Sequence, residues 1–421
     1  MGETIFNKKM SRREALSTGA KIGIAAGIGV AIGAVGGYLG GASTAPPPKT
    51  TTTTVTSTFT KTVPGKKIKA GFIYVGPVGD YGWTYAHEMG RQYVVSKFPW
   101  LETMTEESVP EDQADTVIDR MVSEGADIVF TTSFGYMDST IKAGERYPDK
   151  IFEHCSGYKR RSNVGTYFAE FYQLYYLCGL AAGAVSETNK VGYIAAFPTP
   201  EVIRHINAFV LGARAINPKI KAYVTWLFSW VDPSGARKAA ETLVESKDCD
   251  VLAFTEDTPA TLEVAEEYQK KGKKVWSFSH YSDMQHYGPT AHLTGQVVNW
   301  GLMYERILAD LYSGCWRSKD LWWRIGDGMD YRWSMPVDKS TFDMKLGAVY
   351  PAPLNPVIPE EVRALIKRRY EEMKELIFEP FTGPIRDQDG VLRVKEGERL
   401  GRDELWSMDW FVEGIESKIP S

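Results

Sequence analysis

The feature that most constrains the fold is a regular alternation, from Lys67 onward, of short apolar segments with helical stretches of ten or more residues. Such alternation is typical of α/β domains with parallel sheets. We predict strands at Ile68–Val75, Ile128–Thr132, Ile151–Cys155, Asn163–Phe168, Lys190–Ala195, Lys221–Thr225, Val251–Thr255, Val275–Ser279 and Ala291–Val297. We predict helices at Ala86–Phe98, Asp112–Glu124, Tyr172–Ser186, Pro200–Asn217, Pro233–Ser246, Ala260–Lys271 and Asn299–Ser313. Nine strands are more than one comfortable sheet holds, so the pattern predicts two lobes.

The first 43 residues have the order of an export signal. Arg12 and Arg13 stand in a charged segment that precedes an apolar run rich in Gly and Ala, from about Ile22 to Ala42. This order is typical of a twin-arginine signal. The run is long enough to span about 30 Å of hydrocarbon as a helix, and Pro46 follows the nearest small-residue cleavage site. We therefore expect a retained membrane anchor, with the rest of the chain outside the cytoplasm, at the cell surface or in the periplasm.

Residues 44–66 read as a stalk. Pro46 to Pro48 precede a threonine-rich run from Thr50 to Thr62, and this composition cannot form a packed core. An anchor, a stalk and a globular part together describe a protein displayed on an outer surface.

Composition and motifs exclude several function classes. The formal net charge of -4, without a Lys/Arg-rich run in the globular part, provides no basic field for nucleic acid. The sequence contains no nucleophile elbow, zinc-protease helix or phosphate-binding loop, so we expect no catalytic residues and no cofactor. The cysteines are also too far apart in sequence to form a recognisable metal-binding motif. We therefore expect no metal site and free thiols, and one disulfide is the alternative. The four cysteines are Cys155, Cys178, Cys249 and Cys315.

The loop after the first strand is the first candidate for ligand binding. It runs through Gly and Pro residues into a helix and carries Asp80, Tyr81 and Trp83 within four positions. Ligands of open parallel sheets bind at the carboxyl ends of strands, near helix N-termini. One carboxylate and two aromatic rings suit a flat ligand that forms hydrogen bonds. Asp80 could equally be the N-cap of the helix that follows.

Other strand-end loops carry similar side chains. Because the carboxyl ends of parallel strands lie on one edge of a sheet, we expect these loops to face the same cleft. In the first lobe the candidates are Ser133, Phe134 and Tyr136; in the second they are Phe197, Trp230, Asp257, His280, Tyr281 and Asp283. Capping or loop packing is the competing interpretation for each of them, and Asp257 could belong to the cap of a helix with Pro259.

In its ordered motifs the chain resembles the basic membrane protein (Bmp, PnrA-like) family of ABC-transporter substrate-binding proteins. The resemblance covers essentially everything from Lys67 to the C-terminus. Its motifs are Gly76–Trp83, Thr131–Asp138, Phe152–Tyr158, Asn163–Phe168, Ala195–Pro198, Asn207–Ala213, Val298–Gly301 and Phe381–Gly390. It implies a type I periplasmic-binding fold, in which two Rossmann-like lobes joined by a hinge close over a small molecule. Characterised relatives bind purine nucleosides or nucleobases and deliver them to a permease driven by an ATPase.

The resemblance also implies roles for individual residues. Asp80 and Trp83 match the acid and the aromatic residue that hold a purine base in relatives, and Asp283 matches the acid that binds ribose hydroxyls. Nucleoside binders usually have a lysine where this chain has Val298. Asn299 and Trp300 would then supply an amide and a ring, which suits a free base, while a nucleoside stays open.

The sequence thus predicts an extracytoplasmic substrate-binding protein of an ABC importer that captures a purine base or nucleoside-like heterocycle by lobe closure. The alternatives are a ligand-sensing surface receptor and a nucleoside-processing enzyme. We assign 67–164 with about 284–315 to the N-terminal lobe, and 165–283 with about 316–421 to the C-terminal lobe and a wrapping tail. The first hinge crossing is expected between Tyr158 and Gly165.

Overall fold

The computed structural model describes residues 67–327 and 347–420, apart from the side chain of Asp80. The predicted anchor and stalk lie outside the described residues. Within the described ranges, no helix is both long and apolar enough to cross a membrane.

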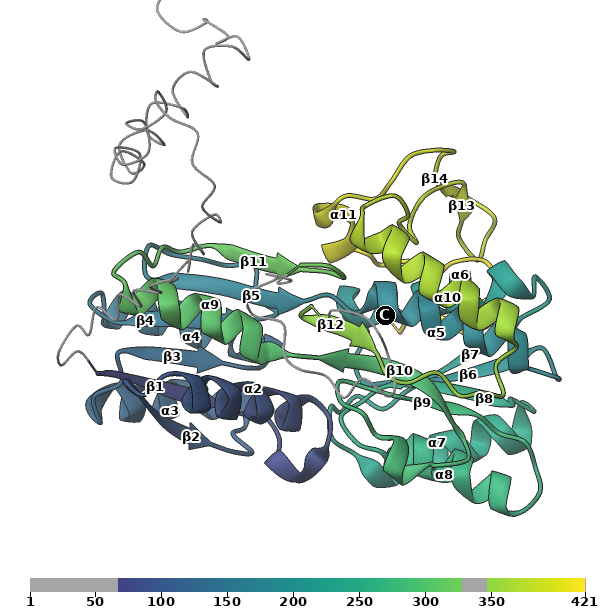
Figure 1. Cartoon of the computed structure of the whole chain (residues 1–421), viewed down its shortest axis with the longest axis horizontal. Coiled ribbons are helices and arrows are strands. Elements are labelled where there is room, and N and C mark those ends of the chain that lie inside the picture. Colours follow the sequence, from purple (N-terminus) through teal and green to yellow (C-terminus); the bar gives the residue numbers. More distant parts are fainter. Residues whose placement is uncertain (1–66, 328–346, 421) are drawn as a thin grey trace, which may run out of the picture. The chain divides into compact units, whose positions relative to one another are not determined.

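Two sheets built almost entirely of parallel strands organise the described chain (Figure 1). The strands of the first sheet, in spatial order, are β11 (Asp320–Trp323), β5 (Val164–Ala169), β4 (Ile151–Cys155), β3 (Ile128–Thr131), β1 (Ile68–Ile73) and β2 (Leu101–Glu106). Every neighbouring pair in this sheet is parallel. This confirms the α/β class with parallel sheets.

The second sheet joins two three-stranded groups. One has the order β7 (Lys221–Trp226), β6 (Lys190–Ala195), β8 (Val251–Thr255), and the other β9 (Ser277–Ser279), β10 (His292–Val298), β12 (Val349–Pro351). A parallel bridge between Val251 and Trp276 connects β8 to β9. Only β12 runs antiparallel to its neighbour in this sheet, as far as the described residues show.

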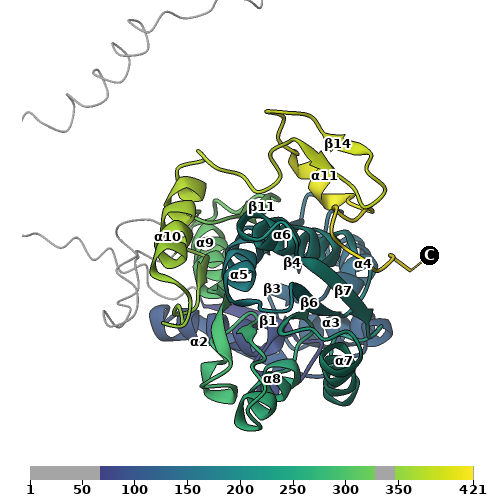
Figure 2. The same ribbon diagram turned by 90° about the vertical axis from the view of Figure 1, so that its right-hand side faces the viewer.

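Helices cover the sheets in pairs (Figure 2). On the first sheet α2 (Trp83–Lys97) packs beside α9 (Trp300–Tyr312), and α3 (Ala114–Ser123) beside α4 (Met137–Arg146). On the second sheet α5 (Tyr172–Val185) packs beside α6 (Pro200–Ile216), and α7 (Pro233–Ser246) beside α8 (Ala260–Lys270). The C-terminal part adds α10 (Glu360–Lys374), the short hairpin β13 (Ile385–Arg386) and β14 (Leu392–Val394), and α11 (Arg402–Trp406).

The α5–α6 contact shows how the sequence sets a close approach of two helices. α5 is apolar on nearly its whole circumference and is buried almost throughout. Gly179 and Gly212 permit the contact, because a Cβ at either position would lie 2.1 Å from a carbonyl oxygen of the other helix. The start of α6 is equally determined by sequence: the Thr199 side chain accepts from the Val202 N–H, and proline stands in the first turn.

Among the described elements, the chain changes sheets three times: after β5, from β10 to α9, and from β11 to β12. The first crossing thus follows Ala169 rather than Tyr158–Gly165, because β5 continues the ladder of β4. Strand pairing likewise places β10 in the second sheet and β11 in the first, where our lobe boundaries had each in the other lobe. The division into two lobes itself stays a prediction.

All four cysteines are free thiols. Three are buried and Cys315 is exposed.

Candidate functional site

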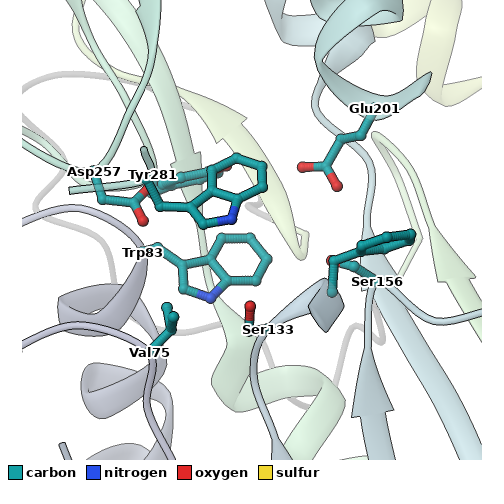
Figure 3. Close-up of a pocket in the computed structure, with 9 residues that line it drawn as sticks. Val75, Trp83, Ser133, Ser156, Glu201, Asp257 and Tyr281 are labelled. Carbon is teal, nitrogen blue, oxygen red and sulfur yellow. The ribbon is translucent and has the colours of Figure 1, made fainter. Parts of the chain in front are cut away.

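Six of the predicted site residues lie around one cavity, enclosed by loops from both sheets. The cavity holds about 20 Å³. Its lining residues are Val75, Trp83, Ser133, Phe134, Ser156, Glu201, Trp230, Asp257 and Tyr281. Figure 3 shows the labelled members converging on one space, with the carboxyl group of Glu201 directed into it. Since this volume is about that of one water molecule, the aromatic side chains themselves fill most of the cleft.

On the first sheet, each contributing side chain follows the C-terminal end of a strand. Val75 follows β1, Ser133 and Phe134 follow β3, and Ser156 follows β4. Ser156 has a positive φ of 64°, which turns the chain sharply at this point. The Ser133 hydroxyl donates to Oε1 of Glu111 at 2.6 Å, which holds the loop that presents Phe134. Phe134 itself remains 38% exposed.

Trp83 is the first residue of α2 and forms the floor of the cavity. It is only 6% exposed, and its ring lies edge-on to Tyr281, with centroids 4.9 Å apart, and to Trp300, with centroids 5.3 Å apart. The indole N–H donates to the carbonyl oxygen of Thr132. Trp83 is therefore held in place from behind, and it also lines the cavity.

Loops of the second sheet supply the opposite wall. Trp230 follows β7, and its carbonyl oxygen accepts from the Asp257 N–H at 2.8 Å. Asp257 follows β8 and is 3% exposed. Tyr281 follows β9 with a positive φ of 64° and is 2% exposed. An acid and two aromatic rings thus face Trp83 and Phe134.

Glu201 lies in the first turn of α6 and adds a second carboxyl group. Burial raises its pKa to about 7, although the nearby Arg204 guanidinium opposes the shift. No hydrogen bond or ion pair of the Glu201 side chain is found among the described residues. This carboxyl group is therefore available to a ligand.

Contacts between the two sides close the cleft. The Ser282 hydroxyl donates to the carbonyl oxygen of Tyr81. A Cβ on Gly82 would lie 2.7 Å from the carbonyl oxygen of Asp257, so the two backbones nearly touch. These contacts join loops of the two sheets beside the cavity.

The other predicted site residues whose side chains are described do not line this cavity. Tyr81 stacks on Tyr85 at 4.8 Å and packs against His286 and Tyr287. The Tyr136 hydroxyl donates to the carbonyl oxygen of Val109 in the core. Phe197 lies behind the wall, with its ring centroid 5.2 Å from that of Trp230. The side chain of Asp80 lies outside the described residues.

The other predicted residues of the loop after β9, and those at the start of α9, also lie away from this cavity. His280 is buried, with Nδ1 2.9 Å from the Tyr175 hydroxyl. Asp283 is exposed and accepts from the Gln285 N–H, so it caps a turn. Asn299 precedes α9, and Trp300 is fully buried, stacked on His87 at 4.4 Å. Trp300 thus supports Trp83 from behind.

Sequence reasoning missed Val75, Ser156 and Glu201. Val75 ends a predicted strand and Ser156 directly follows one, so the rule that selected the other loops would have found them. Glu201 is the second residue of the helix that begins at Pro200, and this start brings its side chain to the cavity. The sequence pattern predicted the start of this helix. Among the described residues no three His, Cys, Asp or Glu side chains come together in a way that would hold a metal ion.

Comparisons with known proteins agree with this architecture. The family model described as ABC transporter substrate-binding protein PnrA-like (Bmp) matches residues 67–329. A purine-binding protein of Brucella abortus (strain 2308) is 36% identical over 357 residues, which is 84% of this chain and 95% of that protein. A putative ABC transporter glucose-binding protein of Haloferax volcanii is 33% identical over 359 residues, or 85% of this chain and 82% of that protein.

Solved structures show the same fold. A solute-binding protein of an ABC transporter system from Aeropyrum pernix K1 has a TM-score of 0.63 and 14% identity, covering 80% of this chain and 95% of that one. Another from Conexibacter woesei has a TM-score of 0.58 and 17% identity, covering 74% of this chain and 98% of that one.

Proposed function

Because the chain belongs to the PnrA-like family of ABC transporter substrate-binding proteins, we propose that it captures a purine base or nucleoside-like flat heterocycle between its two sheets and delivers it to an importer. Proteins of this family bind solutes rather than transform them, and they act outside the cytoplasm with a permease and an ATPase. The ligand and its site residues are the part that we propose.

The observation that carries the proposal is the set of aromatic rings around the cavity. Trp83 and Tyr281 meet edge to face on one side, and Phe134 and Trp230 line the same space. Ring faces of this kind bind planar molecules by stacking, worth about 1–3 kcal/mol per base in proteins that bind single-stranded nucleic acids. The chemistry of this lining therefore suits a flat, aromatic ligand.

Asp257 supplies the polar specificity. Its carboxyl group lies in the wall between the rings and is almost inaccessible to water. An ionised carboxylate only accepts hydrogen bonds, so it would pair with ring N–H or amino groups, which purines present along one edge. This role is the one that we predicted for Asp80, whose side chain is not described.

Closure is the proposed mechanism of capture. The contacts of Tyr81 with Ser282 and of Gly82 with Asp257 join loops of the two sheets. A flat heterocycle does not fit into 20 Å³, so the rings must separate for entry and then close on the ligand. Open and closed forms would present different surfaces to the permease. A membrane anchor at the N-terminus, also proposed, would keep the protein beside it.

A screen of the purified full chain by thermal shift and calorimetry tests the proposal. A ligand that binds only the native state raises the melting temperature. Adenine, hypoxanthine, guanine and their nucleosides are the expected binders. D-glucose belongs in the screen because one relative is described as a glucose-binding protein. A response to glucose without any response to purines would overturn the purine proposal and leave the substrate-binding role intact.

A further inference from the structure

The C-terminal part of the chain is fastened to the second sheet. The Asn207 side chain on α6 donates to the carbonyl oxygen of Trp410 at 2.8 Å and accepts from the Val412 N–H at 2.9 Å. Ala222 of β7 forms a parallel bridge with Ile415, and α10 packs on α5 of the same sheet. This part therefore adds to the β7 edge of the second sheet and would move with that sheet.

The short helix α11 of this part also reaches the first sheet. Arg402 forms an ion pair with Oδ2 of Asp320, on the edge strand β11. Oδ1 of the same carboxylate accepts from the Thr166 hydroxyl of β5 at 2.9 Å, which fixes Asp320 within the first sheet. The Trp406 ring stands edge-on to Phe168 of β5, with centroids 5.7 Å apart. Since α11 also packs on α6, it contacts both sheets (Figure 2).

Aromatic rings and guanidinium groups alternate where α11 meets the sheets. Arg204 of α6 lies over the rings of Phe168 and Trp406, with Cζ 5.7 Å and 5.4 Å from their centroids. Arg402 lies over the rings of Trp406 and Trp322, at 4.3 Å and 5.8 Å. A guanidinium group is attracted to the negative face of an aromatic ring, more strongly where water is excluded. Trp406 is therefore the link between the two arginines.

Two carboxylates balance the charges of this cluster. Glu170 pairs with Arg204 at 3.0 Å and also accepts from the Trp322 indole N–H at 3.1 Å. Asp320 balances Arg402 in the same way. Because Glu170 is the first residue after β5, the cluster surrounds the first crossing of the chain between the sheets.

The cluster borders the cleft at a different place from the contact of Tyr81 with Ser282. α11 lines a larger cavity of about 460 Å³, which shares Glu201 and Trp230 with the smaller one, so the two cavities are continuous. In the first sheet β11 is the edge strand, whereas β1, which precedes the Tyr81 loop, lies four strands away. The two sheets are therefore joined at two separate places beside the cleft.

We propose that α11 is a clasp that restrains the separation of the two sheets, with Arg402 and Trp406 as its positioning residues. The clasp would move with the second sheet, and Asp320, Trp322 and Phe168 with the first, so rotation of one sheet against the other breaks these contacts. In the ligand-free protein the clasp lowers the population of an open form. The inference rests on the proposed function because closure is the motion that the clasp restrains, but it does not depend on which ligand binds.

Distances between spin labels on the two sheets test the clasp without a ligand. The labels are attached at Thr116→Cys of α3 and Ser246→Cys of α7, both at exposed positions. Cys315→Ser removes the exposed native thiol, and the other three cysteines are buried. Double electron–electron resonance on the purified full chain should give one narrow distance distribution for this labelled parent protein.

Asp320→Asn and Arg402→Gln should each add a component at longer distance. We expect the population of this component to rise about fivefold over the parent protein. Because both substitutions remove the same ion pair, the double variant should resemble the single variants rather than show the sum of their effects. Trp406→Leu should shift the distribution further, since this ring contacts both arginines and Phe168.

The matched control is Arg214→Gln. Arg214 pairs with Glu413 at 2.9 Å and so joins the same C-terminal part to α6, within the second-sheet side of the molecule. This variant should keep the label distances of the parent protein, even where its melting temperature falls. Thermal unfolding of each variant shows that the measured protein is folded.

The outcomes separate this inference from the proposed function. If Asp320→Asn and Arg402→Gln keep the distance distribution of the parent protein, the clasp is overturned. Equal broadening in Arg214→Gln would indicate a general loosening of the C-terminal part and would also overturn it, as would a broad distribution in the parent protein. The proposed function fails by a different result, the absence of any purine response in the thermal-shift screen.

Discussion

Nη2 of Arg204 lies 3.0 Å from Oε2 of Glu170, and both side chains are almost inaccessible to solvent. Glu170 is the first residue after β5, where the chain leaves the first sheet, and Arg204 stands on α6 beside the larger cavity. Although burial alone would raise the pKa of Glu170, the charge of Arg204 and the contact with His205 lower it to about 2. The pair therefore ties a cavity-lining helix to the first crossing between the sheets.

Replacing Arg204 by Met should destabilise the protein by about 3–5 kcal/mol, because it leaves a buried carboxylate without its partner. Adding Glu170→Gln should restore much of this loss. Urea unfolding of the single and double variants measures both effects. The control is Arg120→Met, which breaks an exposed pair with Glu106 and should cost about 1 kcal/mol or less. Equal losses of stability in Arg204→Met and Arg120→Met would contradict the stabilising role of the buried pair.

Phe134→Ala should weaken ligand binding by about ten- to a hundredfold, since it removes one stacking face. The melting temperature should change little, because Phe134 is 38% exposed. Trp83→Ala should lower both the ligand affinity and the melting temperature, since this ring is buried against Tyr281 and Trp300. Calorimetry and thermal unfolding of the two variants measure the two effects. An unchanged affinity of Phe134→Ala would show that this ring does not bind the ligand.

Gly82→Ala should disfavour the closed form, because the new Cβ would meet the backbone of Asp257 at 2.7 Å. Affinity should fall, and the radius of gyration of the liganded protein, measured by small-angle scattering, should stay close to that of the open form. Gly79→Ala is the matched control in the same loop, since its Cβ would meet nothing within 4 Å. Identical behaviour of the two variants would show that this contact does not govern closure.

Glu153 predicts a pH dependence of stability. Burial raises its pKa from 4.5 to about 8, against the opposing hydrogen bond from the Trp316 N–H at 2.8 Å. The raised pKa means that the protonated form is favoured in the folded state. Its contribution to stability is fully present below pH 4.5 and is lost as the pH rises through 8, by roughly 5 kcal/mol in total.

The variant Glu153→Gln should be insensitive to this titration. Relative to the wild type, its free energy of unfolding should increase as the pH is raised from 5 to 9, measured by urea unfolding at several pH values. Glu361→Gln, at an exposed position, should follow the wild type. A constant difference between Glu153→Gln and the wild type across this range would show that Glu153 does not titrate there.

The elements that the sequence predicted best are those whose pattern is local. All nine predicted strands form, as β1 and β3 to β10, and all seven predicted helices form. β2 was missed because the segment Leu101–Glu106 is largely polar, as suits a sheet edge. α10 was missed although Val362, Ile366 and Tyr370 recur every four residues on its buried face. That signal was present in the sequence.

The site was predictable only as a set of loops. Strand order brings the loops together, but the direction of each side chain depends on the local backbone and on its neighbours. Tyr281 enters the cavity with a positive φ, while His280 beside it turns into the core toward Tyr175. No local signal predicts that Trp406, from the C-terminal part, reaches the start of α6. Such contacts follow from tertiary packing alone.

The late position of β11 in the chain bears on the order in which the protein can be made. β11 pairs along the outer side of β5, more than 150 residues after it. During synthesis β5 therefore presents unpaired backbone groups until β11 has left the ribosome, and bare strand edges of this kind attract other chains. A product truncated before Asp320 would keep that edge permanently, and we expect it to associate with other chains more readily than a chain that includes β11.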